Sequence, residues 1–340
     1  MITNFFKKKV QRVIDRIDVL LYHNRVVIGN RSYRWCKIPI PEGYPRQSQT
    51  HPSIFYTQEK WNHYTHWLAT TPYPNSDTKF ENPCIYKANQ QNDIIPICYS
   101  PISNNPIVCH PGGDAYNSDP ELFIINNTLY CIIRENENKH YLREIKLSSS
   151  TDGEIWTKPK TIYYSNDEKR QLLSPAYLKT KNKHQIYFLN GDAGIGRHGK
   201  CSGIEIIESE NLETLSFKFV NKGNFTNSKE VGIEPWHFDL FEYKNCLYMV
   251  LCGRNKKRKT IRNPMETFLA VSTDRINFHI FEKPLIRYFK TYRPSAYIDE
   301  AGIFHLYFST IGFYLNDNSD RNIGVTSIPF KQLLNELKDK

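Results

Sequence analysis

The sequence lacks any apolar run long enough to cross a membrane, because no stretch of about 18 apolar residues occurs in it. The first residues also lack the apolar core and the small-residue cleavage site of an export signal. We therefore expect a protein that neither spans a membrane nor carries a cleaved signal peptide, and that works in the cytoplasm.

Cysteine pairs of the kind that hold zinc are also missing. The eight cysteines are scattered, with no C-x-x-C pair and no histidine at zinc-ligand spacing. Several lie inside apolar runs such as residues 129–132, where cysteine acts as a small hydrophobic residue. The pattern predicts free thiols in a reducing compartment, and the spacing predicts no metal site.

Acidic residues are fewer than basic ones, 35 against 45, and the formal net charge is +10. Such a balance favours polyanionic partners, namely nucleic acid, anionic lipid or an acidic glycan. The densest basic patch, residues 255–259, has no interleaved aromatic residues and is typical of a solvated hairpin tip. We therefore predict no nucleic-acid partner.

Residues 1–24 are expected to form one amphipathic, basic helix. The positions with helical spacing on its apolar face are Phe6, Val10, Val13, Ile14, Ile17, Leu20 and Leu21. Lysine and arginine crowd the other face, so residues 3–22 could lie on an anionic membrane surface. The same apolar stripe would serve equally well to pack across the rest of the protein, and the sequence leaves both interpretations open.

Aromatic residues are abundant, with 22 Tyr and 19 Phe, and they favour strands. Past residue 50 the apolar residues follow a period of two, which indicates a β protein. A short proline motif recurs in this region. Its five copies read HPSIF at 51–55, DPELF at 119–123, SPAYL at 174–178, PWHFDL at 235–240 and RPSAY at 293–297.

The spacing of the copies predicts one propeller blade for each. Their prolines fall at 52, 120, 175, 235 and 294, about 60 residues apart, which suits a four-stranded antiparallel sheet with its turns. An aromatic strand follows each copy, as at residues 247–250. We predict an all-β fold, a five-bladed β-propeller over residues 45–329, with the amphipathic helix before it and a short helix at 330–340 after it.

A second recurrence, serine-threonine-aspartate followed by an aromatic residue, stands at 150–156 and 272–278. A looser copy covers residues 208–217. An aspartate in such a position accepts hydrogen bonds from the backbone of its own turn. We expect these aspartates to be structural and the aromatic residues to fill the space between blades.

Inner strands of a propeller converge on its axis, so the polar residues of the five motifs should share one pocket. These residues are His51, Asp119, Glu121, Ser174, Glu234, His237, Asp239 and Arg293. Glu81, Arg134 and Asp192 are further candidates at the same rim. Each also has a structural interpretation, such as a turn cap or an ion pair between blades. The glycine-rich stretch 191–200 leads into a strand, which does not favour a nucleotide site.

Several strings within residues 45–328 resemble a group of bacterial and phage-associated propeller proteins related to family 43 glycoside hydrolases. They are TPYPN at 71–75, ENP at 81–83, YNSDPEL at 116–122, LSPA at 173–176, PWHFD at 235–239 and YRP at 292–294. The resemblance implies a five-bladed fold and three carboxylates on successive inner strands. The chain departs from that pattern, because His51 and Ser174 stand where two of the acids would be.

Under this resemblance Asp119 matches one carboxylate, and Glu234 or Asp239 would supply the acid of a two-carboxylate hydrolase. His51, Glu81, Glu121, Arg134, Asp192, His237 and Arg293 are then the predicted substrate-binding residues. No cofactor is predicted, although a propeller axis is compatible with a divalent cation held by carboxylates and water.

We expect a glycan-cleaving enzyme acting on a bacterial surface polysaccharide. Two alternatives stay open. One is a membrane-associated sugar or phosphosugar transferase of capsule or lipopolysaccharide biosynthesis, and the other is a propeller that binds a glycan without turnover.

Overall fold

The computed structural model describes residues 25–26, 31–91, 94–191, 200–257, 265–286, 290–311 and 321–338, together with Val10 and Val13. The helix expected at residues 1–24 therefore lies almost wholly outside the described residues, as does Asp192. No helix in the described part of the chain is long and apolar enough to span a membrane.

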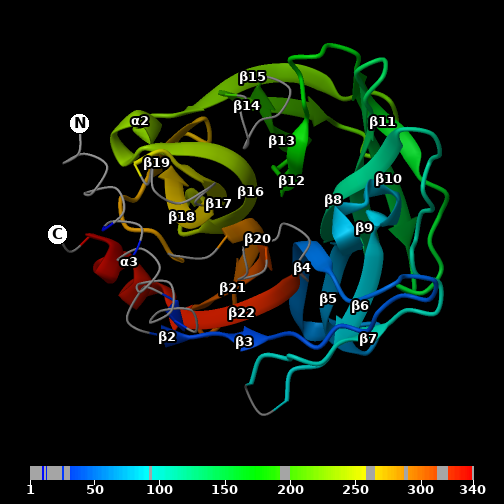
Figure 1. Cartoon of the computed structure of the whole chain (residues 1–340), viewed down its shortest axis with the longest axis horizontal. Helices are drawn as coiled ribbons and strands as arrows, with labels where there is room; N and C mark the ends of the chain where they lie inside the picture. Colours follow the sequence, from blue (N-terminus) through cyan, green and yellow to red (C-terminus); the bar gives the residue numbers. More distant parts are fainter. Residues whose placement is uncertain are drawn as a thin grey trace.

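The chain forms five antiparallel sheets arranged around one axis, and Figure 1 looks down that axis. Blade 1 contains β4 (Gln49–Trp61), β5 (Tyr64–Pro72), β6 (Cys84–Ala88) and β7 (Ser100–Pro101). Blade 2 contains β8 (Ala115–Ile125), β9 (Thr128–Glu137), β10 (Leu142–Ser150) and β11 (Lys160–Ser165). Blade 3 contains β12 (Leu173–Lys179), β13 (His184–Gly191), β14 (Cys201–Ser209) and β15 (Lys218–Phe225).

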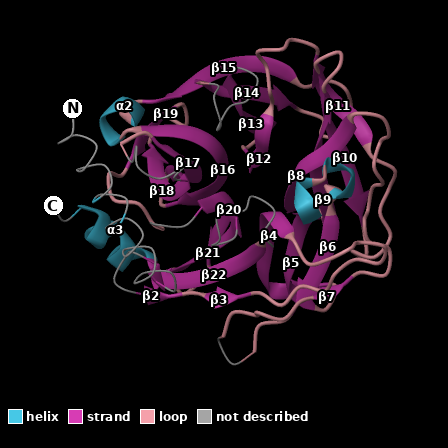
Figure 2. Cartoon of the chain, in the orientation of Figure 1, coloured by secondary structure: helices cyan, strands magenta, loops and turns pink. Residues whose placement is uncertain are grey.

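Blade 4 contains β16 (Ile233–Tyr243), β17 (Cys246–Asn255), β18 (Met265–Ser272) and β19 (Asn277–Ile280). Blade 5 contains β20 (Lys290–Ile298), β21 (Ile303–Ile311), β22 (Asn322–Pro329) and β3 (Arg34–Trp35). The five-bladed all-β fold that the repeats predict is thus confirmed, with each proline motif on an innermost strand (Figure 2).

The ring is closed by residues upstream of the predicted boundary at 45. Strand β3 pairs antiparallel with β22, with Trp35 opposite Gly324, so the outermost strand of the last blade comes from the beginning of the described chain. Blades 3 and 4 are also joined, because β15 and β19 pair in parallel through Asn224 and Asn277.

Short elements complete the structure. They are β1 (Arg25–Val26), which pairs with β2 (Arg31–Ser32), the 3-10 helices η2 (Pro74–Ser76) and η3 (Thr78–Phe80), and the helices α2 (Ser228–Val231) and α3 (Phe330–Lys338). Helix α3 covers the predicted C-terminal helix and buries Phe330, Leu333 and Leu337 against blades 4 and 5.

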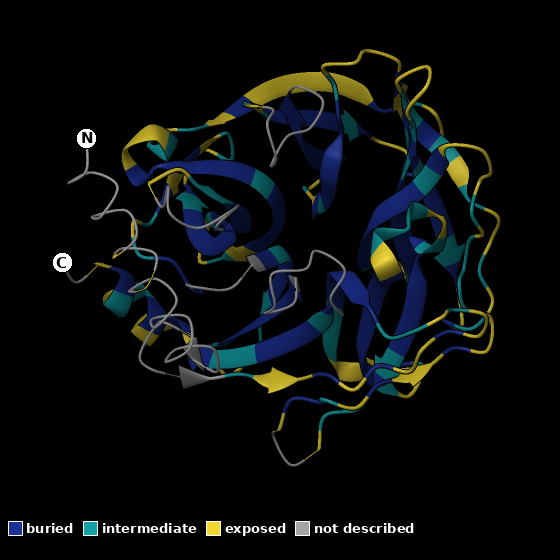
Figure 3. Cartoon of the chain, viewed as in Figure 1, coloured by how far each residue is buried: buried dark blue, intermediate teal, exposed yellow. Residues whose placement is uncertain are grey.

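The core consists of five apolar clusters, each filling the space between two consecutive blades. Figure 3 shows that the inner strands of the blades are mostly buried. Phe278 and Phe217 are buried in two of them, and Trp156 packs against a third. The side chains of Asp152 and Asp274 accept backbone N–H groups of their own turns. The structural interpretation of the serine-threonine-aspartate frames is therefore confirmed.

Every innermost strand carries a β-bulge at its proline motif. The pairing register shifts between Thr50 and Ser53 in blade 1, and at the equivalent place in each of the other four blades. A bulge bends the strand and re-aims a side chain. In blades 1 to 3 the residue before the proline adopts the left-handed conformation, with φ of 50° at His51, 48° at Asp119 and 52° at Ser174. Such backbone is costly for residues other than glycine and gathers at functional sites.

Candidate functional site

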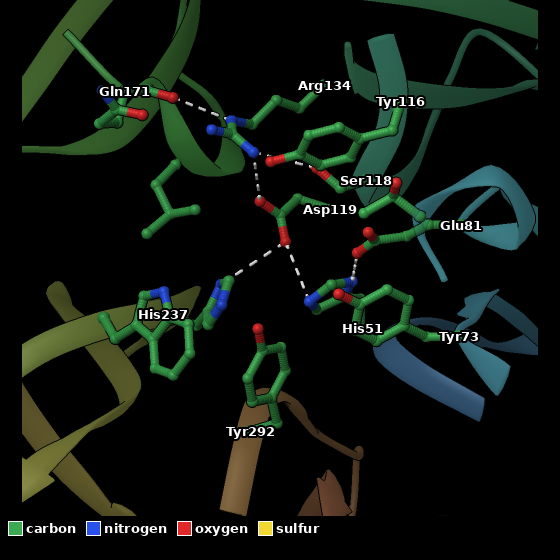
Figure 4. A pocket seen from close by; sticks show the side chains of 13 residues that line it. His51, Tyr73, Glu81, Tyr116, Ser118, Asp119, Arg134, Gln171, His237 and Tyr292 are labelled. Atoms are coloured by element: carbon green, nitrogen blue, oxygen red, sulfur yellow. Dashed lines mark hydrogen bonds and ion pairs between the residues drawn. The ribbon is translucent and has the colours of Figure 1, made fainter. Parts of the chain in front are cut away.

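A pocket of about 280 Å³ opens on the propeller axis, where the five inner strands converge. Its volume is near the lower end of the range for ligand pockets. The residues that line it are His51, Tyr73, Thr78, Glu81, Tyr116, Ser118, Asp119, Arg134, Gln171, Leu173, Trp236, His237 and Tyr292. Figure 4 shows these side chains converging on the Asp119 carboxylate.

Three buried side chains from three blades meet at the bottom of this pocket, and we call them the axial triad: His51, Asp119 and His237. Oδ1 of Asp119 lies 3.6 Å from Nε2 of His51 and 3.5 Å from Nδ1 of His237. One candidate ligand atom from each residue can be chosen so that all three lie within 4.8 Å of one another. The three residues come from blades 1, 2 and 4 and lie far apart in the sequence, so no short motif spacing could predict that they meet.

Neighbouring polar groups hold the triad in place. Nδ1 of His51 lies 2.7 Å from Oγ1 of Thr71 and 3.2 Å from a Glu81 oxygen. Nδ1 of His237 lies 2.6 Å from Oγ of Ser174. The backbone N–H of Ser174 donates to Oδ2 of Asp119. Contacts of this kind fix the ring orientation of histidine ligands in metal sites.

The triad nevertheless leaves three polar atoms without a hydrogen-bond partner. They are Nε2 of His51, Oδ1 of Asp119 and Nε2 of His237, and all are buried. Unpaired buried polar atoms are rare because each costs about 1–3 kcal/mol. Three of them on touching residues indicate a ligand that supplies the missing interactions.

The separation of these atoms fits a metal ion. Two ligand atoms that each lie about 2.1 Å from one ion are themselves about 3.0–3.6 Å apart, which matches the 3.6 Å between Nε2 of His51 and Oδ1 of Asp119. Two imidazoles and one carboxylate suit a divalent transition ion such as Zn²⁺ better than Ca²⁺, which takes oxygen ligands.

The triad also has the protonation states that a metal requires. Burial lowers the pKa of His51 well below its usual range, and it lowers the pKa of His237 to about 4. Burial raises the pKa of Asp119, but the two histidines and then Arg134 outweigh burial and hold that pKa below its usual value. At neutral pH the set is therefore two neutral imidazoles and one carboxylate, ready to bind a cation.

Glu81 and Arg134 line the wall beside the triad, where the sequence placed them as candidates. Burial and next the Asp119 carboxylate raise the pKa of Glu81 well above its usual value. Arg134 donates to Oγ of Ser118 and to the carbonyl of Gln171, and its guanidinium lies 3.7 Å from Oδ2 of Asp119. The wall thus offers one carboxyl group and one fixed cation.

Three other candidates lie below the pocket and form what we call the axial ion cluster: Glu121, Arg293 and Asp239. Arg293 is fully buried, pairs with Glu121 at 3.0 Å, and donates to the carbonyls of Pro120 and Pro175. Asp239 accepts from the hydroxyl of Ser295 and the N–H of Ala296. The expectation that these side chains line the pocket does not hold.

A two-residue step along each strand explains why Glu121 and Asp239 lie below the pocket. Glu121 follows Asp119 by two residues and Asp239 follows His237 by two, so each pair faces the axis on the same strand face. Two residues span about 6.5 Å of strand, which puts the second member one layer deeper. Glu121, Arg293 and Asp239, with Ser53 and Tyr177, connect all five inner strands to one another.

Glu234, the remaining catalytic candidate, also lies outside the pocket lining. Its carboxylate accepts from the N–H of Cys201 and pairs with Lys256. The two-carboxylate arrangement of Asp119 with Glu234 or Asp239 is therefore not assembled, and Glu81 is the other carboxyl group of the described pocket.

The sequence reasoning did not single out the aromatic wall. Trp236 and Tyr292 line the pocket and meet edge to face, with ring centroids 4.7 Å apart. Both stand inside the recurring motifs, directly beside His237 and Arg293. Their neighbours drew attention because they are charged or polar, whereas an aromatic residue in a strand is usually core.

No family model matches the sequence, and no curated protein matches it either. Solved structures do share its fold. An N-acetylgalactosamine deacetylase from F. plautii, in complex with blood group B trisaccharide, aligns with a TM-score of 0.73 at 18% identity, over 90% of this chain and 97% of that one.

Two family 43 structures align more loosely. A β-xylosidase/α-arabinofuranosidase from a compost microbial metagenome has a TM-score of 0.59 at 12% identity, over 87% of this chain and 94% of that one. A GH43_1 enzyme from Xanthomonas citri has a TM-score of 0.57 at 9% identity, over 84% and 88%. These likenesses confirm the five-bladed propeller fold that the resemblance implied.

Proposed function

We propose that the protein is a metal-dependent hydrolase that removes the N-acyl group from an amino sugar. The observation that carries the proposal is the axial triad, whose three residues each leave one buried polar atom unpaired and each offer one ligand atom within 4.8 Å of the other two. The three protein ligands leave coordination positions open, as catalytic metal sites do.

The reaction adds water across an amide, and its products are a free amine and a carboxylic acid such as acetic acid. A divalent ion in the triad would polarise the carbonyl and acidify the attacking water. Glu81, which lines the pocket beside the triad, would take the proton from that water and return it to the leaving nitrogen. Burial raises its pKa above the usual value, which makes it a stronger base once it is ionised.

The pocket also suits a sugar. Trp236 presents a partly exposed ring at the rim, and the flat apolar face of a pyranose packs well on such a ring. The structures that share this fold are named as an N-acetylgalactosamine deacetylase and as family 43 glycosidases, which supports a glycan substrate. We propose a bacterial surface polysaccharide as the natural source of that glycan.

A reconstitution assay tests the proposal. The full chain is stripped with a chelator, reloaded with Zn²⁺ or Mn²⁺, and given oligosaccharides that end in N-acetylgalactosamine or N-acetylglucosamine. We expect release of acetate only after reloading. Asp119→Asn should reduce that release by more than about 10³-fold, whereas Asp114→Asn, at an exposed position of the same segment, should leave it unchanged. Equal acetate release by the stripped and reloaded chains would refute the metal dependence.

A second candidate is the glycosidase that the sequence favoured. One observation supports it: the pKa of Asp119 is lowered and that of Glu81 is raised, as in a base and acid pair that cleaves glycosidic bonds. The same assay separates the two candidates, because a glycosidase releases a reducing sugar without acetate and without a metal.

We keep two further readings of the same pocket as outcomes of that assay. Products that require a nucleotide-linked or lipid-linked sugar would indicate a transferase, and tight binding of the oligosaccharide without turnover would indicate a binding protein. We also propose that residues 3–22 bind the protein to the cytoplasmic face of a membrane. Flotation with anionic liposomes, with and without residues 1–24, tests it, and equal flotation would exclude it.

A further inference from the structure

One phenol of the pocket faces the axial triad from the side opposite Asp119. The ring of Tyr292 lies 5.0 Å from the ring of His51 and 4.8 Å from that of His237, measured between centroids. Figure 4 shows its hydroxyl pointing between the two histidines toward the Asp119 carboxylate. Within the described residues this hydroxyl has no hydrogen-bond partner.

The two neighbouring histidines each use one ring nitrogen within the protein, His51 toward Thr71 and His237 toward Ser174. Tyr292 is half-buried, and a tyrosine hydroxyl that has no partner in its own protein is available to a ligand. The free hydroxyl is therefore a donor that points into the space where a ligand of the triad would sit.

The phenol is held in position. Contacts with three rings, those of His51, His237 and Trp236, hold its ring in place. A donor that is already aimed costs no reorganisation when the reaction needs it.

We propose that Tyr292 is a catalytic residue that donates a hydrogen bond to the acyl oxygen of the substrate as negative charge develops on that oxygen. The inference rests on the proposed hydrolysis of an N-acyl group and adds the group that stabilises its transition state. Attack of water turns the carbonyl into a tetrahedral oxyanion, and Tyr292 would bind that oxygen beside the metal while Glu81 handles the proton.

The first test compares Tyr292→Phe with the wild-type chain, both loaded with Zn²⁺. Loss of one oxyanion donor should lower kcat for acetate release by about 10²–10³-fold and change KM little. The affinity for Zn²⁺, measured by competition with a chelating dye, should stay within about threefold, because the phenol is not a ligand. Tyr164→Phe, which removes an exposed hydroxyl far from the pocket, is the matched control and should leave kcat unchanged.

The second test does not depend on turnover. Acetate, the acid product, is expected to bind the Zn²⁺-loaded wild-type chain with one oxygen near Tyr292, so its affinity measured by calorimetry should fall about tenfold in Tyr292→Phe. If wild type binds acetate more tightly than the variant but releases none from any substrate, the proposed hydrolysis fails and the Tyr292 contact stands. Unchanged kcat and unchanged acetate affinity would overturn the Tyr292 proposal alone, and a tenfold loss of Zn²⁺ affinity would make Tyr292 a ligand instead.

Discussion

Two layers of buried polar side chains lie on the propeller axis, the axial triad above and the axial ion cluster below. They differ in whether the protein itself supplies hydrogen bonds to their carboxylate oxygens. In the axial ion cluster below, all four oxygens of Glu121 and Asp239 accept hydrogen bonds from within the protein. In the axial triad above, Oδ1 of Asp119 accepts none, and each histidine has an unpaired nitrogen.

The difference separates structure from function without reference to any related protein. A buried carboxylate whose oxygens all accept hydrogen bonds within the protein contributes to holding the blades together, and it has no capacity left for a cation. The unpaired atom of the lower cluster, Nε of Arg293, is an N–H donor and cannot bind a metal ion. A buried charge that the protein leaves unsatisfied is a cost that persists in the free protein. The axial triad is therefore the layer with unpaired atoms that a ligand can bind, and the axial ion cluster supports it from below.

Removal of the cation from the lower layer should give the largest effect. Arg293→Met leaves Glu121 and Asp239 buried beside each other without a positive charge, so we expect a loss of about 3–5 kcal/mol in the free energy of unfolding. Urea denaturation followed by tryptophan fluorescence measures it. Arg293→Lys keeps the charge but not the forked donor geometry and should lose less. A change below about 1 kcal/mol in Arg293→Met would remove the structural role assigned to the cluster.

Metal should stabilise the upper layer only. Zn²⁺ at about 100 times its dissociation constant should add about 2.7 kcal/mol to the unfolding free energy of the wild-type chain. His237→Gln should abolish this gain because it removes a ligand. Glu121→Gln, its counterpart one layer down, should retain the gain even if its own baseline is lower. Thermal unfolding with and without Zn²⁺ measures both, and loss of the gain in Glu121→Gln would couple the layers that we separate.

The two layers should respond to pH with opposite sign. The pKa of His237 is lowered from 6.5 to about 4, so the unfolded chain binds a proton first as pH falls, and the metal-free protein should lose stability between about pH 6.5 and 4. The slope should approach about 1.4 kcal/mol per pH unit for each histidine. His237→Gln should flatten it, and an unchanged slope would mean that His237 is not neutral in the folded protein.

The axial ion cluster should show the opposite dependence of stability on pH, through Glu121. Burial, and next Asp239, raise the pKa of Glu121 well above its usual value, so the folded protein holds a proton that the unfolded chain has lost. Stability from this group is present in acid and declines as pH rises through the folded pKa. Urea titrations of Glu121→Gln at pH values rising from about 4.5, the usual pKa of a glutamate, should show a weaker decline than wild type.

The smallest expected effect concerns the support of one histidine. Thr71→Val keeps the shape of a buried side chain but removes the hydroxyl that lies 2.7 Å from Nδ1 of His51. Partners of this kind contribute about 10–100-fold to metal affinity, and we expect about tenfold weaker Zn²⁺ binding. Titration against a chelating dye measures the affinity. An unchanged value would leave Glu81 as the group that orients His51.

The fold could be read from the sequence because it repeats. Five proline motifs about 60 residues apart carry the same information five times, and strand pairing needs no more than that pattern. The serine-threonine-aspartate turns could also be read, since an aspartate and the N–H groups it accepts lie within four residues of one another.

The site could be predicted only in part, because the sequence does not show how far along the propeller axis each side chain lies. His51 was identified as a departure from an acid pattern, whereas the structure shows it as a member of the axial triad, with Nε2 3.6 Å from Oδ1 of Asp119. His237 and Asp239 share one strand face, as the period of two predicts, but they belong to different layers. The distinction depends on how deep along the axis each position of the strand lies, which no residue type specifies.

Closure of the ring by strand β3 bears on how the protein folds. Arg34 and Trp35 pair with residues that are synthesised nearly 300 positions later, Val325 and Gly324. Contacts so distant in sequence form slowly, because closing the long intervening loop costs conformational entropy before the contacts can stabilise the fold. Blades 1 to 4 can each form from local hairpins during synthesis, whereas blade 5 has its outer strand only once β22 has emerged. Until then the nascent protein carries an open sheet edge on its last blade, which is where a chaperone or a second copy of the chain would first find it.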